Sequence, residues 1–149
     1  MRRDVLLVAH IAAISAWLGA NVVQFVLTPW FARRSIPENL GWISATLFLG
    51  RRYYNVVGAL VAFTGVLLVL ESDYNFSAGF VIVGVAMIVV GAVTGVAVFD
   101  RLINQHIVAL QSSDLVLAAQ LRARTLWVAV VDTSLLLLTA YAMVKRWHA

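Results

Sequence analysis

Four long apolar runs, each bounded by charged or polar residues, dominate the pattern of hydrophobic positions along the chain. They cover residues 5–27, 53–71, 77–99 and 125–145. Roughly 20 apolar residues in a helix span the hydrocarbon core of a bilayer, and continuous runs are not the alternating strands of a membrane barrel. The pattern therefore predicts an all-α integral membrane four-helix bundle that forms a single transmembrane domain over residues 1–149.

The connections between the runs carry helix signals of their own. After the first run, Ser35 to Glu38 form a capping-box pattern with proline in the first turn. It predicts a short helix over 37–49 that lies along the membrane interface. In the third connection, helical spacing continues until Ser112-Ser113-Asp114, which ends one helix and caps the next. Helices three and four are therefore expected to project beyond the bilayer as a short hairpin.

Composition supports the membrane and excludes several other classes. The chain is 62% hydrophobic and 12% charged, with a mean hydropathy of +0.92, so a water-exposed surface could not be covered by charged groups. Cysteine is absent, which excludes disulfides, thiolate metal sites and iron–sulfur clusters. The net charge of +4 comes from Lys and Arg at the ends of apolar runs, which is typical of membrane anchors and not of nucleic-acid binding.

The distribution of Lys and Arg also predicts an orientation. The first and third connections hold seven of these residues, the termini four and the second turn none. The positive-inside rule then places both termini outside. The first run is longer than the apolar core of a signal peptide and contains His10 and Trp17, so we expect it to remain as a helix.

Polar residues of all four runs fall at neighbouring depths in the membrane. A carboxyl group as deep as Asp132 costs about 2.5–3.5 kcal/mol on insertion scales, so it is expected to face the bundle interior. The cluster predicted around it comprises Asn21, Gln24, Asn55, Thr94 and Asp132. It is either a hydrogen-bonded latch that fixes helix order or a site that handles protons or ions. An arginine reaching Asp132 from position 51 or 52 would favour the latch.

His10 is the second candidate inside the membrane. One intramembrane histidine can ligate haem or copper, or it can be a neutral imidazole bonded to Tyr141 or to a backbone carbonyl. The candidate metal ligands are His10, Met143 and His148, and the candidate cofactor contacts are His10 and Tyr141. A second histidine for haem is not expected nearby, and three methionines do not make a soft-ligand cluster.

Small residues recur at helical spacing in the first and third runs. Gly84, Gly91 and Gly95 form one stripe, and Ala9 to Gly19 offer a second. Such stripes allow close helix contacts, either inside the bundle or with partners. The expected partners are the lipid bilayer and either further copies of the chain or other membrane subunits, with no nucleic acid.

The segment from His10 to Gly19, with Trp17 two residues before the glycine, resembles the first helix of bacterial copper-resistance D-type membrane domains and of HemJ-type protoporphyrinogen oxidases. The whole layout, including Met143-Val144-Lys145, is similar to a family of uncharacterised four-helix bacterial membrane proteins. The resemblance implies a multi-pass protein of the bacterial inner membrane, with His10 as a ligand of haem b or copper. The chain departs from these families in lacking the arginine and second histidine after the first span, and the extra histidines and methionines of copper handling.

No catalytic motif is recognisable, since the chain has no GxSxG, phosphate-binding glycine loop or HExxH pattern. The sequence therefore favours a non-enzymatic membrane protein that is a homo-oligomer or an accessory subunit of a larger complex. The alternatives are a haem- or copper-binding protein using His10 and a proton or ion pathway through Asp132.

Overall fold

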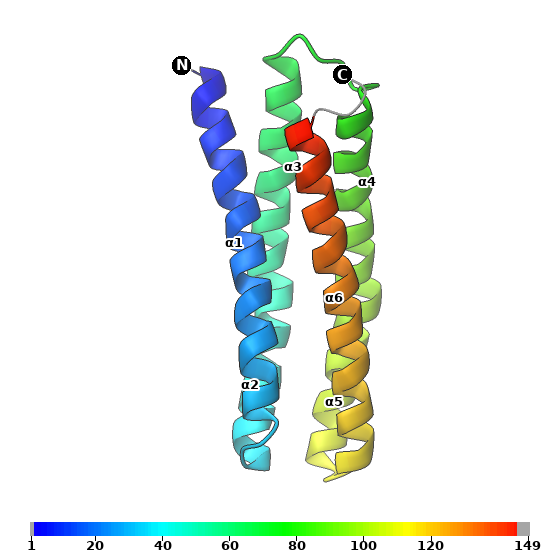
Figure 1. Ribbon diagram of the computed structural model, residues 1–149. Coiled ribbons are helices and arrows are strands. Elements are labelled where there is room, and N and C mark those ends of the chain that lie inside the picture. Colours follow the sequence, from blue (N-terminus) through cyan, green and yellow to red (C-terminus); the bar gives the residue numbers. More distant parts are fainter. Residues whose placement is uncertain (1, 146–149) are drawn as a thin grey trace.

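The computed structural model describes residues 2–145, which form four long antiparallel helices and no strand (Figure 1). The first is α1 (Arg2–Phe31) and the last is α6 (Leu115–Lys145). Between them, two long helices are each divided by a π-helical turn: α2 (Ile36–Leu49), η1 (Gly50–Tyr54) and α3 (Asn55–Leu70), then α4 (Gly79–Val93), η2 (Thr94–Phe99) and α5 (Asp100–Gln111). The all-α four-helix bundle predicted from the sequence is confirmed.

All four long helices in the described range are long and apolar enough to cross a membrane. Each has 30 or more residues and so extends roughly 45 Å or more, beyond the thickness of the hydrocarbon core. The start of α1, the end of α6 and the turn between α3 and α4 lie at one end of the bundle (Figure 1). The other end holds α2, α5 and the first turns of α6.

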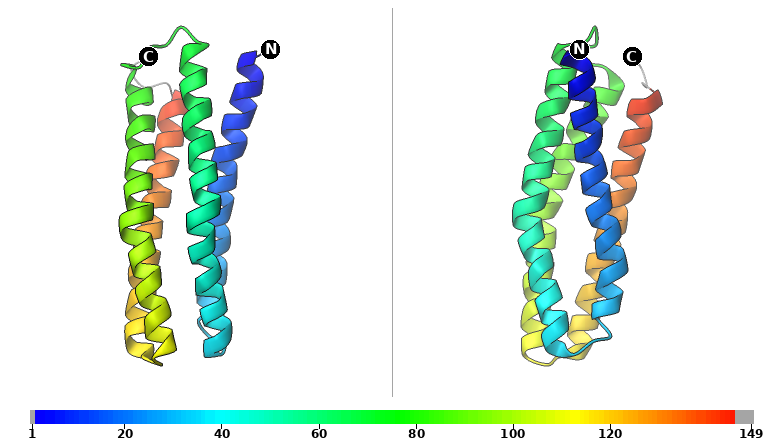
Figure 2. Two further views of the ribbon diagram at one scale, coloured as in Figure 1. Left: turned by 180° about the vertical axis from the view of Figure 1, so that it is seen from behind. Right: turned by 90° about the vertical axis from the view of Figure 1, so that its left-hand side faces the viewer.

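The short helix after α1 is confirmed, but its expected orientation along the interface is wrong. Its start follows the predicted capping pattern, because the backbone amide and hydroxyl of Ser35 donate to the Glu38 carboxylate at 3.1 and 2.6 Å. At its end, Gly50 keeps helical angles, and its amide bonds to carbonyls of the preceding turn. A single glycine weakens a helix without ending it, so residues Ile36–Leu70 form one continuous helix (Figure 2).

The hairpin of α5 and α6 is confirmed, with the predicted break between them. Ser113 adopts a positive φ of 58°, and the amide of Asp114 bonds back to the carbonyl of Ala109 at 2.9 Å. The Asp114 carboxylate then accepts the amide of Leu117 at 3.0 Å, which caps the start of α6. The Ser112–Asp114 segment thus acts as the sequence predicted.

Two separate apolar clusters hold the bundle together. The first lies among the apolar runs and consists of Ala13, Trp17, Val57, Val61, Met87 and Leu136. The second joins α2, α5 and α6 and consists of Ile43, Ile103, Ala109, Leu110, Ala118 and Leu121. Because the second cluster lies where the helices pass beyond the apolar runs, this end of the bundle is a packed extension with a core of its own.

Two glycines of the predicted stripe, Gly84 and Gly91, pack inward from α4. A Cβ atom added at Gly84 would lie 2.5 Å from the Met143 methyl carbon, and one added at Gly91 would lie 3.3 Å from the Trp17 ring. These two glycines therefore allow close packing inside the bundle and are not available to a partner helix.

Candidate functional site

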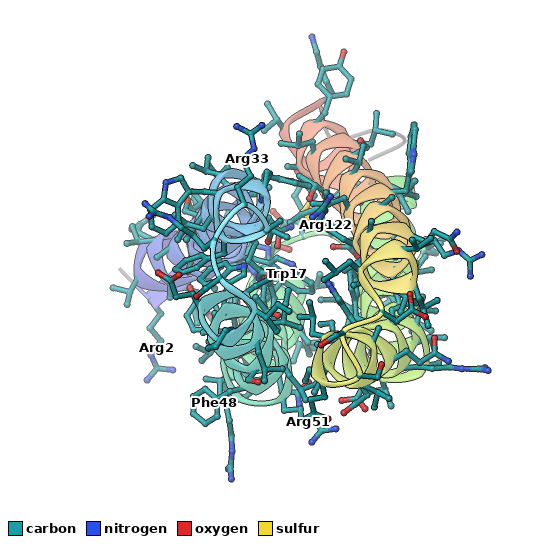
Figure 3. All side chains as sticks on the ribbon, turned by 90° about the horizontal axis from the view of Figure 1, so that it is seen from below. Arg2, Trp17, Arg33, Phe48, Arg51 and Arg122 are labelled. Atoms are coloured by element: carbon teal, nitrogen blue, oxygen red, sulfur yellow. The ribbon has the colours of Figure 1, made fainter. Side chains whose placement is uncertain are left out.

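A cavity of about 540 Å³ lies between two helical hairpins. The first hairpin is α1 with the α2–α3 helix, and the second is the α4–α5 helix with α6. The lining residues come from all four long helices. In the end-on view, Arg122 and Trp17 lie toward the space between the hairpins, whereas Arg2, Arg33 and Phe48 lie outside (Figure 3). The cavity is therefore the place where polar groups of distant segments meet.

Asp132 of α6 lies on the wall of this cavity and is 7% exposed. Within residues 2–145, no group donates a hydrogen bond to its carboxyl group. Tyr54 is close enough to interact with it electrostatically, but its hydroxyl bonds elsewhere. Asp132 is thus a buried acid whose polar atoms are left to whatever occupies the cavity.

Beside Asp132, a chain of hydrogen bonds connects the two hairpins. Gln24 donates from its side-chain nitrogen to the Tyr54 hydroxyl at 2.7 Å, and that hydroxyl donates to the Asn21 side-chain oxygen at 2.6 Å. The Asn21 nitrogen then donates to the hydroxyl of Thr133 at 2.8 Å. This polar latch joins α1, η1 and α6, and Asp132 is not part of it.

The structure brings together part of the predicted polar cluster. Asn21, Gln24 and Asp132 all line the cavity. Asn55 also lines it, but is exposed and donates to the backbone carbonyl of Arg51 on its own helix at 2.9 Å. Thr94, at the start of η2, is not among the lining residues. The cluster is therefore centred on α1 and α6, with Asn55 at its margin.

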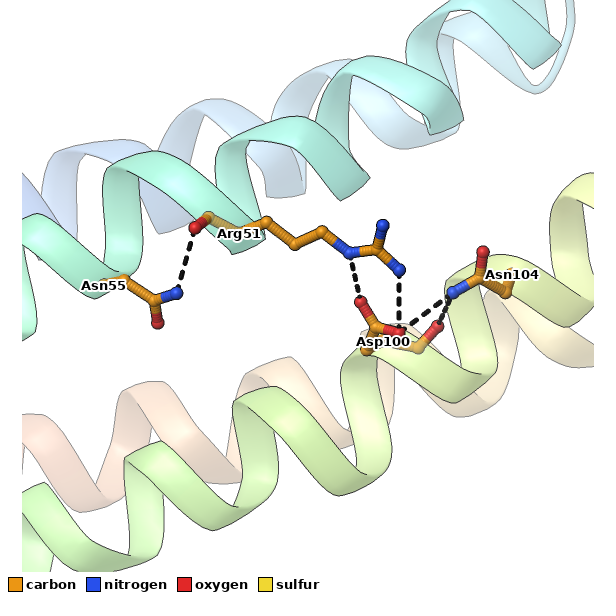
Figure 4. A network of polar contacts seen from close by, with 4 residues as sticks. All are labelled: Arg51, Asn55, Asp100 and Asn104. Carbon is orange, nitrogen blue, oxygen red and sulfur yellow. Dashed lines mark hydrogen bonds and ion pairs between the residues drawn. The ribbon is translucent and has the colours of Figure 1, made fainter.

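Arg51, which would have favoured the latch by reaching Asp132, does not reach it. Arg51 instead binds Asp100 at two points, with Nε–Oδ1 and Nη2–Oδ2 distances of 2.6 and 3.0 Å (Figure 4). Asn104 donates to the same carboxylate at 3.0 Å. The Arg51 side chain is 58% exposed and that of Asp100 is 32% exposed. The guanidinium group therefore pairs with a carboxylate at the end of the apolar runs while it stays in contact with water. Arg52 is exposed as well.

Two π-helical turns form opposite walls of the cavity. Gly50, Arg51 and Tyr54 contribute from η1, and Val96 and Phe99 from η2. A π-helical turn has more residues than an α-helical one and changes which side chains face inward, and such turns are frequent at functional sites. Tyr54 was not among the residues predicted from the sequence, although it shares the helical spacing of Gly58 and Ala62, which also line the cavity.

The other end of the cavity is basic. His106 of α5 is 3% exposed, Arg122 of α6 is partly buried, and both line the cavity. The charge of Arg122 acts on the His106 ring. Over the described range, no carboxylate forms an ion pair with Arg122. Neither residue was a candidate in the sequence, because Arg122 was counted with the membrane anchors and His106 lies outside the four apolar runs.

His10 is buried at a different level, between α1 and α3. Its Nδ1 lies 2.8 Å from the Thr64 hydroxyl, which itself donates to the carbonyl of Leu60 at 2.6 Å. Because that hydroxyl proton is already used, Nδ1 carries a proton and donates to Thr64. The observed partner of the imidazole is therefore the hydroxyl of Thr64 on α3, which the sequence did not indicate.

The other proposed ligands do not gather around His10. Tyr141 is 50% exposed on α6, and Met143 is packed against Gly84. His148 lies outside the described residues. Among those described, no three His, Asp or Glu side chains come close enough to hold a metal ion. Haem or copper ligation therefore stays a prediction that rests on His10 alone.

The lining of the cavity combines apolar side chains such as Trp17, Ile88 and Leu126 with a few polar groups, a composition that is also found in small-molecule sites. Asp132 and Arg122 are ten residues apart on α6, about 15 Å along the helix.

Comparison with known proteins offers no relative to guide the assignment, because no family model, curated protein or solved structure matches the chain.

Proposed function

We propose that this chain is a multi-pass membrane protein that binds a small, mainly apolar molecule between its two hairpins. In this proposal Asp132 accepts a hydrogen bond from the molecule, which carries a donor or a protonated amine. The observation that carries the proposal is the carboxyl group of Asp132, 7% exposed, without a hydrogen bond from residues 2–145, and on the wall of a cavity of about 540 Å³.

Physical reasons favour a ligand over a purely structural role for Asp132. A polar group that is buried without a partner costs free energy, and a carboxyl group in a membrane costs more. The latch of Gln24, Tyr54, Asn21 and Thr133 is complete without Asp132. Helix order is therefore held by other residues, and a donor on a ligand would offset the cost of burying the acid. The cavity volume lies in the range of small-molecule sites, about 300–1,000 Å³.

The proposal is tested with dansylcadaverine, a fluorescent apolar molecule that ends in a primary amine. Titration of the purified protein is expected to give saturable binding that Asp132→Asn weakens by about tenfold or more, because hydrogen bonds to charged groups contribute about 1.5–3 kcal/mol. The matched control is Glu71→Gln, which neutralises an exposed carboxylate at the end of α3. Equal binding by the wild type and Asp132→Asn would refute the proposal.

We further infer that the protein resides in a bacterial inner membrane with both termini outside. The support is the excess of Lys and Arg in the first and third connections, seven against four at the termini. Since the chain has no cysteine, single-cysteine variants report sidedness without background. An impermeant maleimide applied to spheroplasts is expected to label Asp73→Cys, and to label Gln111→Cys only after lysis. The reverse pattern would invert the orientation.

The remaining hypotheses from the sequence stay predictions with tests of their own. If His10 ligates haem or copper, the purified protein will show a Soret band or stoichiometric copper that His10→Ala removes. If Asp132 carries protons, Asp132→Asn will abolish proton flux in liposomes. A role as a homo-oligomer or accessory subunit would use the exposed small residues Ala9, Ala12 and Gly19 of α1, and cross-linking in native membranes would detect it.

A further inference from the structure

The basic end of the cavity has no structural explanation within the part of the chain that the structure describes. Arg122 and His106 line the cavity, His106 is almost fully buried, and no carboxylate forms an ion pair with Arg122 in residues 2–145. Arg51 provides the comparison, since it lines the same cavity and is satisfied by two bonds to Asp100. Arg122 therefore presents to the cavity a positive charge without an acidic partner.

The position of this charge matches the level of lipid head groups. Arg122 precedes the last apolar run by three residues, and the exposed Arg51–Asp100 pair lies where the second and third apolar runs end. Viewed from this end of the bundle, Arg122 lies between the hairpins and not on the outer surface (Figure 3). An anionic group at the membrane–water boundary can thus reach it from the head-group side.

The cavity continues from Arg122 into the apolar layer. Along α6, Arg122, Leu126, Ala129 and Asp132 recur at intervals of three or four residues and all line the cavity. Ile88 and Ala92 of α4 line the cavity on the same hairpin, and Phe25 of α1 and Ala62 of α3 line it on the opposite one. A molecule held at Arg122 would therefore have its apolar part between the hairpins, directed toward Asp132.

We propose that Arg122 and His106 bind the phosphate or carboxylate head of a single-chain amphiphile whose apolar chain occupies the cavity between the hairpins and ends in the hydrogen-bond donor that Asp132 accepts. This deepens the proposed function and rests on it, because the same cavity is used and the ligand class is now named. Arginine suits the role, since its planar guanidinium group can donate two hydrogen bonds to an oxyanion, and the buried His106 ring supplies a further donor.

The test measures binding of 12-aminododecanoic acid, which carries a carboxylate at one end and an amine at the other, to the full chain in a maltoside detergent, with folding of each variant checked by its melting temperature. Arg122→Gln is expected to weaken binding by about tenfold or more, the effect of removing a bidentate charge-assisted contact. Arg122→Lys should fall between the two, since it keeps the charge and loses the planar fork. The matched control is Arg124→Gln, on the same helix but outside this cavity, and it should bind as the wild type does.

Two further arms identify the source of the anionic group and separate the two proposals. If inorganic phosphate does not compete, the occupant is a lipid-like molecule; if it competes fully, a free anion is the occupant and the amphiphile is excluded. Equal losses in Arg122→Gln and Arg124→Gln would mean general surface attraction and would overturn the inference. Dansylcadaverine binding that depends on Asp132, with no effect of Arg122→Gln on 12-aminododecanoate binding, would overturn this inference alone and leave the proposed function standing.

Discussion

The side-chain amide of Asn21 donates a 2.8 Å hydrogen bond to the hydroxyl of Thr133, which joins α1 to α6 one residue from Asp132. The two neighbouring side chains on α6 therefore differ in their hydrogen bonds. Thr133 is hydrogen-bonded to the opposite hairpin, and Asp132 faces the cavity without a hydrogen bond from residues 2–145. This difference separates the group that holds the bundle together from the group that is available to a ligand.

Loss of the Asn21–Thr133 hydrogen bond should destabilise the bundle, and a substitution that leaves the net charge unchanged can test this. Thr133→Val keeps the shape of the side chain and deletes the acceptor of Asn21, so we expect the free energy of unfolding to fall by about 1 kcal/mol, a typical value for hydrogen bonds between membrane helices. Unfolding in mixed micelles titrated with dodecyl sulfate measures it. Ser134→Ala is the control, because that hydroxyl donates only to the carbonyl of Val130 on its own helix. A loss in the control as large as that in Thr133→Val would argue against the latch.

The ion pair of Arg51 with Asp100 should contribute little to stability. Both side chains are partly in water, and exposed pairs are typically worth about 0–1 kcal/mol. We expect a double-mutant cycle with Arg51→Gln and Asp100→Asn to give a coupling energy within that range that decreases as salt is added. Arg52→Gln, one residue away and exposed, serves as the control for Arg51→Gln. A coupling energy of several kcal/mol would show that the pair is shielded from water.

Ser113 offers a stabilising substitution. Its φ of 58° lies in the left-handed region, where glycine has no steric cost and serine does. Ser113→Gly is therefore expected to raise the free energy of unfolding by up to about 1 kcal/mol. Ser112→Gly is the comparison, because Ser112 has a φ of −83° and donates its hydroxyl to Val108, so this change should destabilise. Stabilisation by both variants, or by neither, would contradict the assigned turn.

The close packing at Gly84 of α4 predicts that larger side chains are not tolerated there. Gly84→Val should destabilise the bundle by about 1–3 kcal/mol through overpacking, since even a Cβ atom would meet the end of Met143 at 2.5 Å. Met143→Ala in the same chain should recover most of the loss. Gly19→Val tests the opposite case, because nothing lies within 4 Å of a Cβ atom there. No recovery with Met143→Ala would place Gly84 on a different face.

The sequence was sufficient for the fold because the strongest signals in this chain are long apolar runs. Continuous runs of about 20 residues have few alternatives in lipid, and local caps such as Ser35–Glu38 and Asp114 act within a few residues. The orientation of α2 was not predictable in the same way. It depends on whether the helix continues through Gly50 into η1, and a glycine alone does not decide that.

The candidate site was only partly predictable. The depth of a residue along a helix can be counted from the sequence, but the neighbour toward which its side chain points cannot. Counting brought Asn21 and Asp132 to similar depths, and both line the cavity. It did not reveal that Arg51 would bind Asp100, or that the Tyr54 hydroxyl would join the latch. Arg122 and His106 were missed because their relationship arises only when α5 and α6 pack together.

Photo-crosslinking tests the central claim most directly. The purified protein is irradiated with an apolar primary amine that carries a diazirine, and the labelled residues are identified by mass spectrometry. We predict labelling of cavity residues from both hairpins, such as Trp17 and Ala129, that Asp132→Asn removes and Glu71→Gln does not. Labelling of the outward-facing Val23 and Trp127 that is the same in all three proteins would contradict binding at Asp132.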